Sequence, residues 1–339
     1  MHDLPKPSDE ASHVPPVMGP EAASYWLVLG GSGFVGRAVA EVLCRPEHDI
    51  ESPRLLVPTR QRTHALGLGH LPKVDVVQAD VHDDGDLAKL VDGAAAVISL
   101  VGILHGDEAA FEQAHIALPR RLARACRAAN VRRIVHVSAL GAGERAPSMY
   151  LRSKARGEAA LRDAGLEVTV LRPSVMFGAE DRLLNLFAKL QRFLPVLPLA
   201  AADARFEPVW VGDVAEAVAR CLAEPKTIGQ VYECTGPEVL TLAQLVQAAG
   251  VYAGHSSHIV PLPSWLGRLQ AQLLEWWPGA PLMSRDNLAS MQVPSVATGD
   301  KPGLAALGIH TTALDSVAPI YLGRRFGCAR LDSLRAQHT

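Results

Sequence analysis

The chain has 339 residues, of which 48% are hydrophobic and 20% charged, a balance typical of a globular protein with room for one large α/β domain or two smaller ones. The formal net charge of −2, without a basic stripe interleaved with aromatic residues, argues against a nucleic acid partner. Five scattered cysteines without a CxxC spacing argue against a disulfide framework and a zinc site, so we expect no metal and a reducing, cytoplasmic environment.

The first residues of the chain and its longest apolar run predict neither a targeting signal nor a membrane span. Residues 1–24 contain five prolines and lack an apolar core flanked by basic residues, so we interpret them as a disordered tail. Residues 94–104 form the longest apolar run, which is too short to cross a bilayer and fits a buried parallel strand. Residues 326–339 are interpreted as a second, solvated tail.

From Tyr25 onward, apolar runs of strand length alternate with longer amphipathic segments, which is typical of βαβ units on a parallel sheet. The predicted strands span residues 25–30, 54–59, 74–79, 95–102, 133–139 and 167–173. The predicted helices span about 34–45, 84–91, 107–129, 149–164 and 213–224. This pattern predicts an α/β fold with a doubly wound parallel Rossmann sheet.

The alternation of strands and helices ends after residue 174, where prolines become frequent. We therefore predict a nucleotide-binding Rossmann domain at 25–178, to which residues 206–235 return. Within that return, residues 209–225 are predicted as a short strand, a tight turn and a helix capped by Asp213. Residues 179–205 and 236–325 would form a smaller C-terminal lobe on the substrate side.

A glycine-rich turn, VLGGSGFVG at residues 28–36, is the strongest functional signal. Gly30 suits a tight turn, Gly33 lets the backbone approach a pyrophosphate, and Gly36 lets the following helix pack closely on the strand. The free N–H groups at the helix start attract phosphate charge. The predicted dinucleotide contacts in this turn are Gly30, Ser32, Gly33, Phe34, Val35 and Gly36.

The end of the second predicted strand, VPTRQR, predicts which dinucleotide is bound. An acidic residue here holds the ribose 2′-hydroxyl of NAD, whereas a basic residue accommodates the 2′-phosphate of NADP. This chain has Arg60 and Arg62 and no acid, which favours NADP(H) over NAD(H). The alternative is that both arginines are ordinary charges of an exposed loop.

Two further strand ends carry candidate cofactor contacts. Asp80 and Val81 follow the third strand, where the carboxylate of Asp80 could accept from the adenine amino group or could serve only as a turn or cap residue. Gly102 follows the fourth strand and either lies beside the cofactor or only ends that strand.

The motifs GGSGFVG (30–36), HVSALGA (136–142), YLRSK (150–154), LRPSVMFG (171–178) and VWVGDVAEAV (209–218) resemble, in this order, the short-chain dehydrogenase/reductase superfamily in its extended or atypical branch. More narrowly, LRPSVMFGAEDRLLN at 171–185 resembles the group containing the NADPH-binding accessory subunit of respiratory complex I and its bacterial relatives. The resemblance spans residues 25 to about 235.

The superfamily resemblance implies a catalytic set of Ser138, Tyr150 and Lys154. Ser138 would hydrogen-bond a substrate oxygen and Tyr150 would be the general acid/base, while Lys154 would hold the nicotinamide ribose and lower the pKa of the tyrosine. Spacing of four residues puts Tyr150 and Lys154 on one helix face, although tyrosine and lysine also occur at this spacing by chance. The resemblance also implies that Arg172 and Pro173 position the nicotinamide end; the alternative is a proline that only stops the strand.

The chain departs from many active extended members in one position, because Phe177 stands where they have a tyrosine before the glycine that is here Gly178. The complex I accessory group retains NADPH, and the resemblance to it does not imply turnover. A complete triad therefore indicates a capacity for proton transfer rather than a substrate.

A tryptophan-rich stretch in the C-terminal lobe, LPSWLGRLQAQLLEWWPGAP, carries a stripe of large apolar residues that includes Trp265, Trp276 and Trp277. Such a stripe fits core packing. It also fits a docking surface for a membrane or a partner protein, with residues 262–278 making peripheral membrane contact.

Two functions from different classes fit the sequence. In the first, an NADP(H)-binding protein with a structural or regulatory cofactor serves NADH:quinone respiration or quinone metabolism, with respiratory-chain or quinone-biosynthesis proteins as partners and a place at the inner face of the cytoplasmic membrane. In the second, an oxidoreductase, epimerase or dehydratase transfers hydride between NADPH and a carbonyl or alcohol, with Tyr150 as the acid/base.

Overall fold

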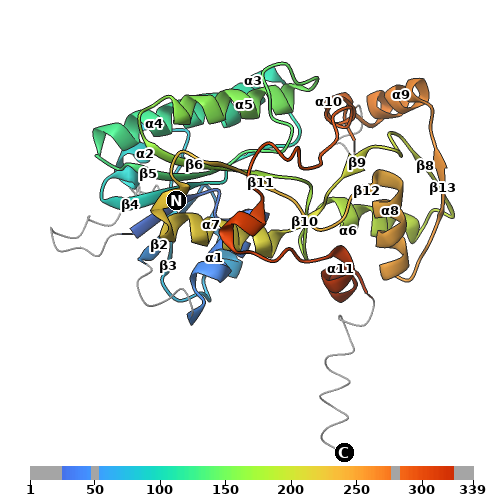
Figure 1. The fold of residues 1–339 in the computed structure, drawn as a ribbon, viewed down its shortest axis with the longest axis horizontal. Helices are drawn as coiled ribbons and strands as arrows, with labels where there is room; N and C mark the ends of the chain where they lie inside the picture. Colours follow the sequence, from blue (N-terminus) through green and yellow to red (C-terminus); the bar gives the residue numbers. More distant parts are fainter. Residues whose placement is uncertain (1–24, 47–52, 276–282, 324–339) are drawn as a thin grey trace, which may run out of the picture.

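Seven parallel strands form the central sheet of the computed structural model, which describes residues 25–46, 53–275 and 283–323 (Figure 1). Their order across the sheet is β11-β6-β5-β4-β1-β2-β3. The strands are β1 (Tyr25–Leu29), β2 (Arg54–Thr59), β3 (Val74–Gln78), β4 (Ala94–Ser99), β5 (Arg133–Val137), β6 (Glu167–Pro173) and β11 (Val231–Cys234). The predicted doubly wound fold is confirmed, and the six predicted strands are all present with ends shifted by a few residues at most.

Helices cover both faces of the sheet (Figure 1). One face carries α1 (Phe34–Leu43) and α7 (Val211–Ala223), which pack against each other, and the opposite face carries α2 (Asp84–Val91), α4 (Leu118–Ala128) and α5 (Met149–Arg162). Each face has its own cluster of buried aliphatic side chains from the strands and the covering helices. The strands are therefore buried on both faces, which explains their nearly continuous apolar sequences.

The predicted helix at 107–129 is interrupted. It consists of α3 (Glu108–Phe111), a π-helical segment η3 (Glu112–Ala117) and α4. Opposite η3, the backbone of α5 comes so close that a Cβ added to Gly157 would lie 1.9 Å from the carbonyl oxygen of His115. Only glycine fits at this crossing, and the π-helical turn places His115 against α5.

Two features around α7 differ from the sequence-based expectations. The seventh strand, β11, was not predicted as a strand, and it pairs with β6 at the edge of the sheet. Asp213 was predicted to cap α7, but the N-cap is Trp210 and the Asp213 carboxylate accepts hydrogen bonds from the backbone N–H and the hydroxyl of Thr312, at 2.7 and 3.0 Å. Asp213 therefore ties α7 to a distant part of the chain.

The C-terminal lobe has a third cluster of buried apolar side chains, drawn from residues between Phe177 and Leu322. Its helices are α6 (Leu183–Gln191), α8 (Leu242–Tyr252), α9 (Ser264–Glu275), α10 (Arg285–Ser290) and α11 (Leu314–Leu322). Its strand pairs are β7 (Met176–Phe177) with β10 (Val209–Trp210), β8 (Val196–Leu199) with β13 (His258–Pro261), and β9 (Arg205–Phe206) with β12 (Leu240–Thr241). The predicted domain boundaries stay a prediction, and Leu304, Leu307 and Ile309 pack in the cluster of α1 and α7 rather than in that of the lobe.

The lobe is fastened to the Rossmann part at the start of α5. The carboxylate of Asp286, in α10, accepts hydrogen bonds from the backbone N–H groups of Met149 and Tyr150, at 2.6 and 3.0 Å. The side chain of Asn287 donates to the carbonyl of Leu104, in the loop after β4, at 3.4 Å. Helix α10 therefore bridges the loop after β4 and the first turn of α5.

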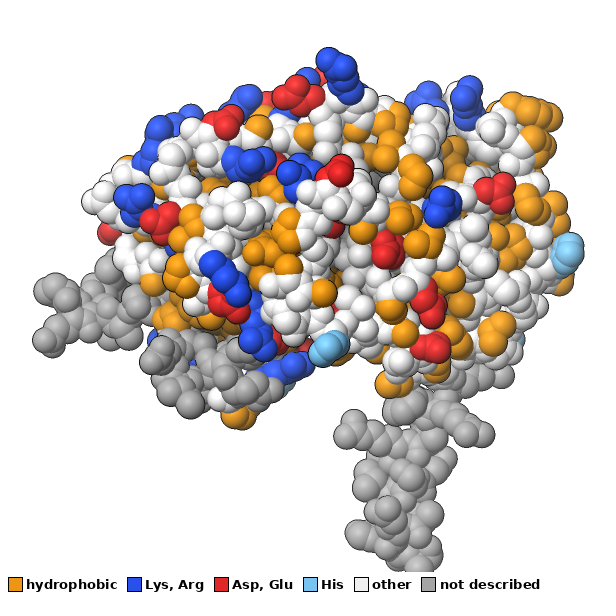
Figure 2. Space-filling view, viewed as in Figure 1, with side chains coloured by type: hydrophobic (Ala, Val, Ile, Leu, Met, Phe, Trp, Pro, Cys, Tyr) orange, Lys and Arg blue, Asp and Glu red, His pale blue; other side chains and the backbone are white. Residues whose placement is uncertain are grey.

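Helix α9 contains the described part of the tryptophan-rich stretch. Its Ala271 is buried and Gly267 lies against Ala200, whereas Trp265 is 67% exposed and Leu269 is 47% exposed. Figure 2 shows hydrophobic side chains at the upper right, over α9. One side of α9 is thus packed and another is open, while Trp276 and Trp277 lie outside the described residues, as do the two predicted tails.

None of the helices within 25–46, 53–275 and 283–323 is long and apolar enough to cross a membrane.

Candidate functional site

The glycine turn lies at the point where the order of the strands reverses. Strands β1 and β4 are neighbours there, and the chain leaves them toward opposite faces of the sheet. Gly30 has a φ of +80°, and a Cβ added to it would lie 3.0 Å from the backbone nitrogen of Val101, in the loop after β4. A crevice at such a switch point is where open α/β sheets bind their ligands.

Helix α1 begins directly at this crevice. Its N-cap is Gly33, which is exposed and contributes no side-chain cap, so the first N–H groups of the helix are available to a phosphate. A Cβ added to Gly36 would lie 2.4 Å from the Cα of Gly31, which explains the need for glycine where the helix meets the turn. Ser32, Phe34 and Val35 are half-buried around the same turn. These features fit a dinucleotide pyrophosphate.

The region after β2, where the sequence predicts the adenosine end of a dinucleotide, is basic. Arg60 and Arg62 are exposed just beyond the end of β2, at the start of the 3₁₀ helix η2 (Arg62–Leu68). A third arginine that the sequence reading missed, Arg37 of α1, lies beside η2 and forms an ion pair with Glu180. Its Nε atom is buried and has no hydrogen-bond partner among the described residues. The position of Arg37, directly after the GGSGFVG motif, was the signal that could have identified it.

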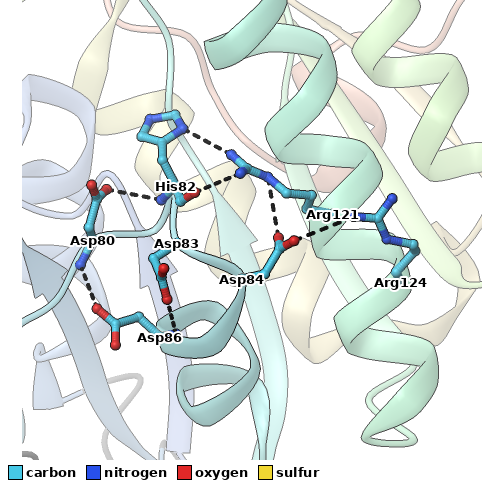
Figure 3. A network of polar contacts seen from close by, with 7 residues as sticks. All are labelled: Asp80, His82, Asp83, Asp84, Asp86, Arg121 and Arg124. Atoms are coloured by element: carbon cyan, nitrogen blue, oxygen red, sulfur yellow. Dashed lines mark hydrogen bonds and ion pairs between the residues drawn. The ribbon is translucent and has the colours of Figure 1, made fainter.

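The loop after β3 is held by aspartates, as Figure 3 shows. Asp83 caps α2 by accepting from the N–H of Asp86 at 2.9 Å, and the Asp86 carboxylate accepts from the N–H of Asp80 at 3.1 Å. The exposed Asp80 carboxylate accepts from the N–H of His82 at 3.0 Å. Asp80 is thus a turn residue in this structure, and its contact with adenine stays a prediction, as does that of the half-buried Val81.

Arg121 of α4 joins the same loop from the other side (Figure 3). It donates to the carbonyl of His82 at 2.6 Å and lies 3.2 Å from its Nδ1, while its Nε is 3.6 Å from Asp84. Burial lowers the pKa of His82. The positive charges of Arg121 and Arg60 lower it further, whereas the negative charge of Asp80 raises it. His82 is therefore neutral near pH 7.

Lys154 and Gly102 lie close together, where the family resemblance predicts the nicotinamide end of a cofactor. Lys154 is 5% exposed, and its Nζ donates to the carbonyl of Val137 at 2.9 Å. A Cβ added to Gly102 would lie 3.4 Å from that Nζ. Burial lowers the pKa of Lys154 to about 8, against the opposing charge of Glu158. An ammonium has three donors, so hydrogens of Lys154 remain available to a ligand.

Tyr150 lies one turn before Lys154 on α5, half-buried, so the predicted common helix face is present. Burial raises the pKa of Tyr150 to about 12. The lowering of this pKa by Lys154, which the family resemblance implies, stays a prediction. Near neutral pH the side chain is a phenol, which is a proton donor.

Ser138 follows β5 and is almost completely buried. Its backbone N–H donates to the carbonyl of Leu171 at 2.7 Å, but its hydroxyl has no hydrogen-bond partner among the described residues. A buried hydroxyl without a partner is uncommon and fits the oxygen of a ligand.

Arg172 has a partner within the protein. Its guanidinium donates to both carboxylate oxygens of the buried Glu158, at 2.9 and 2.8 Å, and thus ties β6 to α5. Pro173 ends β6 and its carbonyl accepts from Leu140, in the loop after β5, at 2.9 Å. Both residues support the walls of the site, and direct cofactor contact by either one stays a prediction.

His115, which the sequence reading missed, lies beneath Tyr150. It is 2% exposed, and its ring centre is 5.6 Å from that of Tyr150, in an edge-on arrangement. Burial and the charge of Lys154 lower the pKa of His115 to about 3, so the imidazole is neutral. A lone histidine inside an amphipathic helix gives no sequence signal, and only the fold brings it to the site.

No group of three or more histidine, cysteine, aspartate or glutamate side chains suited to a metal ion occurs within the residues that the structure describes.

A parallel sheet whose switch point faces an open helix N-terminus is the architecture of a dinucleotide-binding Rossmann protein. The profile of the NAD(P)H-binding family matches residues 30–225. The chain belongs to this NAD(P)H-binding family.

Relatives of similar sequence show which group of NAD(P)H-binding proteins this chain resembles. The chain is 32% identical over 299 residues to the rat protein named NADH dehydrogenase (ubiquinone) 1 alpha subcomplex subunit 9, mitochondrial, covering 85% of this chain and 77% of the relative. It is 28% identical over 302 residues to the NADH-ubiquinone oxidoreductase 40 kDa subunit of Neurospora crassa, covering 87% and 78%. The predicted resemblance to the complex I accessory group is confirmed.

Solved structures share the fold. An NADPH-dependent quinone oxidoreductase from Escherichia coli, in complex with NADPH, superposes with a TM-score of 0.70 at 22% identity, covering 87% of this chain and 99% of that chain. A nucleoside-diphosphate-sugar epimerase from Staphylococcus aureus gives 0.65 at 16% identity, covering 86% and 98%. Both structures thus share the α/β fold of this chain.

The pKa of Lys154 predicts a pH dependence of stability. Between pH 8 and about 10.5 the lysine is largely neutral in the folded state and still protonated in the unfolded state. The free energy of unfolding therefore rises with pH across this window, and this gain is lost as the pH falls to 8. We expect the unfolding free energy of the wild type, relative to Lys154→Met, to rise by about 2 kcal/mol from pH 8 to pH 10. Urea denaturation of both cofactor-free proteins measures it, and parallel pH profiles would contradict the assignment.

Proposed function

We propose that this chain is an NADP(H)-binding protein of the complex I accessory-subunit type, which holds its cofactor as a structural or regulatory group in support of NADH:quinone respiration. The observation that carries the proposal is the identity of 32% across 85% of the chain to a protein named as a subunit of NADH dehydrogenase. Its partners are respiratory-chain proteins or proteins of quinone biosynthesis.

Preference for NADP(H) over NAD(H) rests on charge at the adenosine end. Arg60 and Arg62 lie at the end of β2 and the start of η2, and Arg37 lies beside Gly67 near the end of η2. Strand β2 ends in Thr59 rather than in an acid. Arginine recognises phosphate with paired, charge-assisted hydrogen bonds. The unpartnered Nε of Arg37 supports its assignment as a third 2′-phosphate ligand.

The other cofactor contacts follow the crevice. Gly30, Ser32 and Gly33, with the N–H groups of Phe34, Val35 and Gly36, hold the pyrophosphate, and Lys154 beside Gly102 binds the nicotinamide ribose. The bound dinucleotide supplies a transferable hydride at the Ser138 and Tyr150 end. The residues of the chain bind it, orient it and keep a proton on Tyr150.

The cofactor preference is testable by titration. We expect NADPH to bind at least about tenfold more tightly than NADH, and the double variant Arg60→Gln/Arg62→Gln to remove most of that difference, because the phosphate loses its charged partners. Cofactor fluorescence measures both affinities. The matched control is Arg132→Gln, which lies just before β5, at the end of the strands away from the glycine turn, and forms an ion pair with Glu167. Equal binding of NADPH and NADH by the wild type would refute the preference.

A second candidate function, turnover, is favoured by the unpartnered hydroxyl of Ser138 beside an intact Tyr150 and Lys154. With its pKa near 12, Tyr150 carries a proton at neutral pH and suits the reduction of a carbonyl, in which the phenol donates to the oxygen as hydride reaches the carbon. An oxidoreductase, epimerase or dehydratase would use this same step in one direction or the other.

Purified protein distinguishes the two functions. For the accessory role, we expect NADPH to co-purify and to stay reduced when quinones, carbonyl compounds and sugar nucleotides are added, as followed by NADPH absorbance. Turnover that falls at least about 100-fold in Tyr150→Phe, with NADPH affinity retained, would instead establish the enzyme.

Peripheral membrane contact through residues 262–278 extends the accessory role and would place the protein at the inner face of the cytoplasmic membrane. The described basis is the exposed pair Trp265 and Leu269, which are four residues apart and so share one side of α9. Tryptophan suits a membrane interface because its ring is amphipathic.

Liposome flotation tests the membrane contact. We expect the full-length protein to float with vesicles containing anionic lipid, and the double variant Trp265→Ser/Leu269→Ser to lose at least half of that binding, because about 25 cal/mol per Å² of buried apolar area is lost. The control is Ile320→Ser, which removes an exposed apolar side chain of α11. Equal flotation of both variants and the wild type would contradict the assignment to α9.

A further inference from the structure

His115 links the loop after β4 to helix α5 through a chain of hydrogen bonds. Its Nε2 accepts from the backbone N–H of Ile103, in the loop after β4, at 3.0 Å, and its Nδ1 lies 2.8 Å from the hydroxyl of Ser153. That hydroxyl in turn donates to the carbonyl of Tyr150 at 2.8 Å. Because Nε2 accepts, Nδ1 must carry the proton of the neutral ring, and every member of the chain has a partner.

The same imidazole also supports two rings and borders the ammonium group. The ring of Phe111 lies 5.6 Å from that of His115 and 6.3 Å from that of Tyr150, so the three aromatic side chains pack together. A Cβ added to Gly102 would be 3.6 Å from Nε2 of His115 and 3.4 Å from Nζ of Lys154. His115 is therefore adjacent to the point where Lys154 and the loop after β4 meet.

We propose that His115 is a positioning residue for the nicotinamide half of the cofactor site, fixing the loop at Gly102 and Ile103 relative to Tyr150 and Lys154. This inference rests on the proposed binding of NADP(H). His115 acts through the residues it holds and needs no contact with the cofactor itself.

The geometry explains why the helix is irregular here. The π-helical segment turns His115 inward, and the absence of a side chain at Gly157 lets α5 come close enough for Ser153 to reach the imidazole. An uninterrupted α-helix at 112–117 would change the direction of this side chain. A neutral ring also adds no second cation beside the buried Lys154, so it orders the site without repelling the ammonium.

A histidine that only stabilises the core would affect all ligands alike, whereas a positioning residue affects only the nicotinamide half. The test compares NADPH with 2′,5′-ADP, which carries the adenosine end and the 2′-phosphate but no nicotinamide. For His115→Leu we expect the Kd for NADPH to rise about tenfold or more and the Kd for 2′,5′-ADP to stay within about twofold. His115→Gln, which retains a donor and an acceptor, should recover most of the affinity for NADPH.

Ser153→Ala is a second variant that keeps the imidazole and the packing, in case His115→Leu does not fold. It removes the link to Tyr150 and should weaken NADPH about threefold without changing the affinity for 2′,5′-ADP. Phe111→Leu serves as the packing control, because it changes the ring contacts and none of the hydrogen bonds.

The outcomes separate the two claims. Selective loss of NADPH affinity in His115→Leu or Ser153→Ala supports the positioning role. Equal weakening of both ligands, no weakening of either, or the same selective loss in Phe111→Leu overturns it while the binding function stands. A wild-type protein that binds 2′,5′-ADP and NADPH no better than Arg60→Gln/Arg62→Gln overturns the proposed NADP(H) function and this inference together.

Discussion

The whole site depends on a close approach of two backbones, where the turn after β1 meets the loop after β4. A side chain on Gly30 would lie 3.0 Å from the backbone of Val101, and one on Gly36 would lie 2.4 Å from Gly31. These contacts leave no room for side chains, so the N–H groups of α1 themselves line the crevice. Since the loop after β4 is held on its other side by His115, the two halves of the cofactor site share one rigid boundary.

Burial determines the protonation states around this boundary. His115 and His136 are almost fully buried, and burial lowers the pKa of each, so both rings are neutral. Lys154 is also buried. The negative charge of Glu158 favours its ammonium form, but Glu158 is also ion-paired with Arg172. The pKa of the lysine is therefore lowered to about 8, and a ligand that accepts hydrogen bonds from its free N–H groups would favour the ammonium form.

Local sequence patterns were sufficient to predict the fold and the glycine turn, because both depend on short-range features. Buried parallel strands have continuous apolar sequences, and a glycine turn must follow the first of them. Strand β11 escaped prediction because VYEC is only four residues long and contains a glutamate, whose buried carboxylate is satisfied by Thr298 from a distant segment. Asp213 was misassigned for a similar reason, since a tertiary contact with Thr312 replaces the local cap.

Some residues of the site could be predicted from the sequence, whereas others are brought to it only by the fold. Ser138, Tyr150 and Lys154 follow from the family resemblance, and the structure places Ser138 after β5 and the other two on one face of α5. His115 could not be derived from spacing, because its role depends on the π-helical turn in which the fold places it. Arg37, in contrast, had a local signal in its position directly after the GGSGFVG motif. The partner of Arg172 was likewise invisible in the sequence, since Glu158 lies on a different element.

The contact between Asp286 and the start of α5 distinguishes this helix N-terminus from that of α1. A helix N-terminus carries partial positive charge and can bind an anion. At α5 the N-terminal N–H groups already donate to the carboxylate of Asp286, whereas α1 has no side-chain cap. Of these two helix N-termini, that of α1 is therefore the one open to a phosphate.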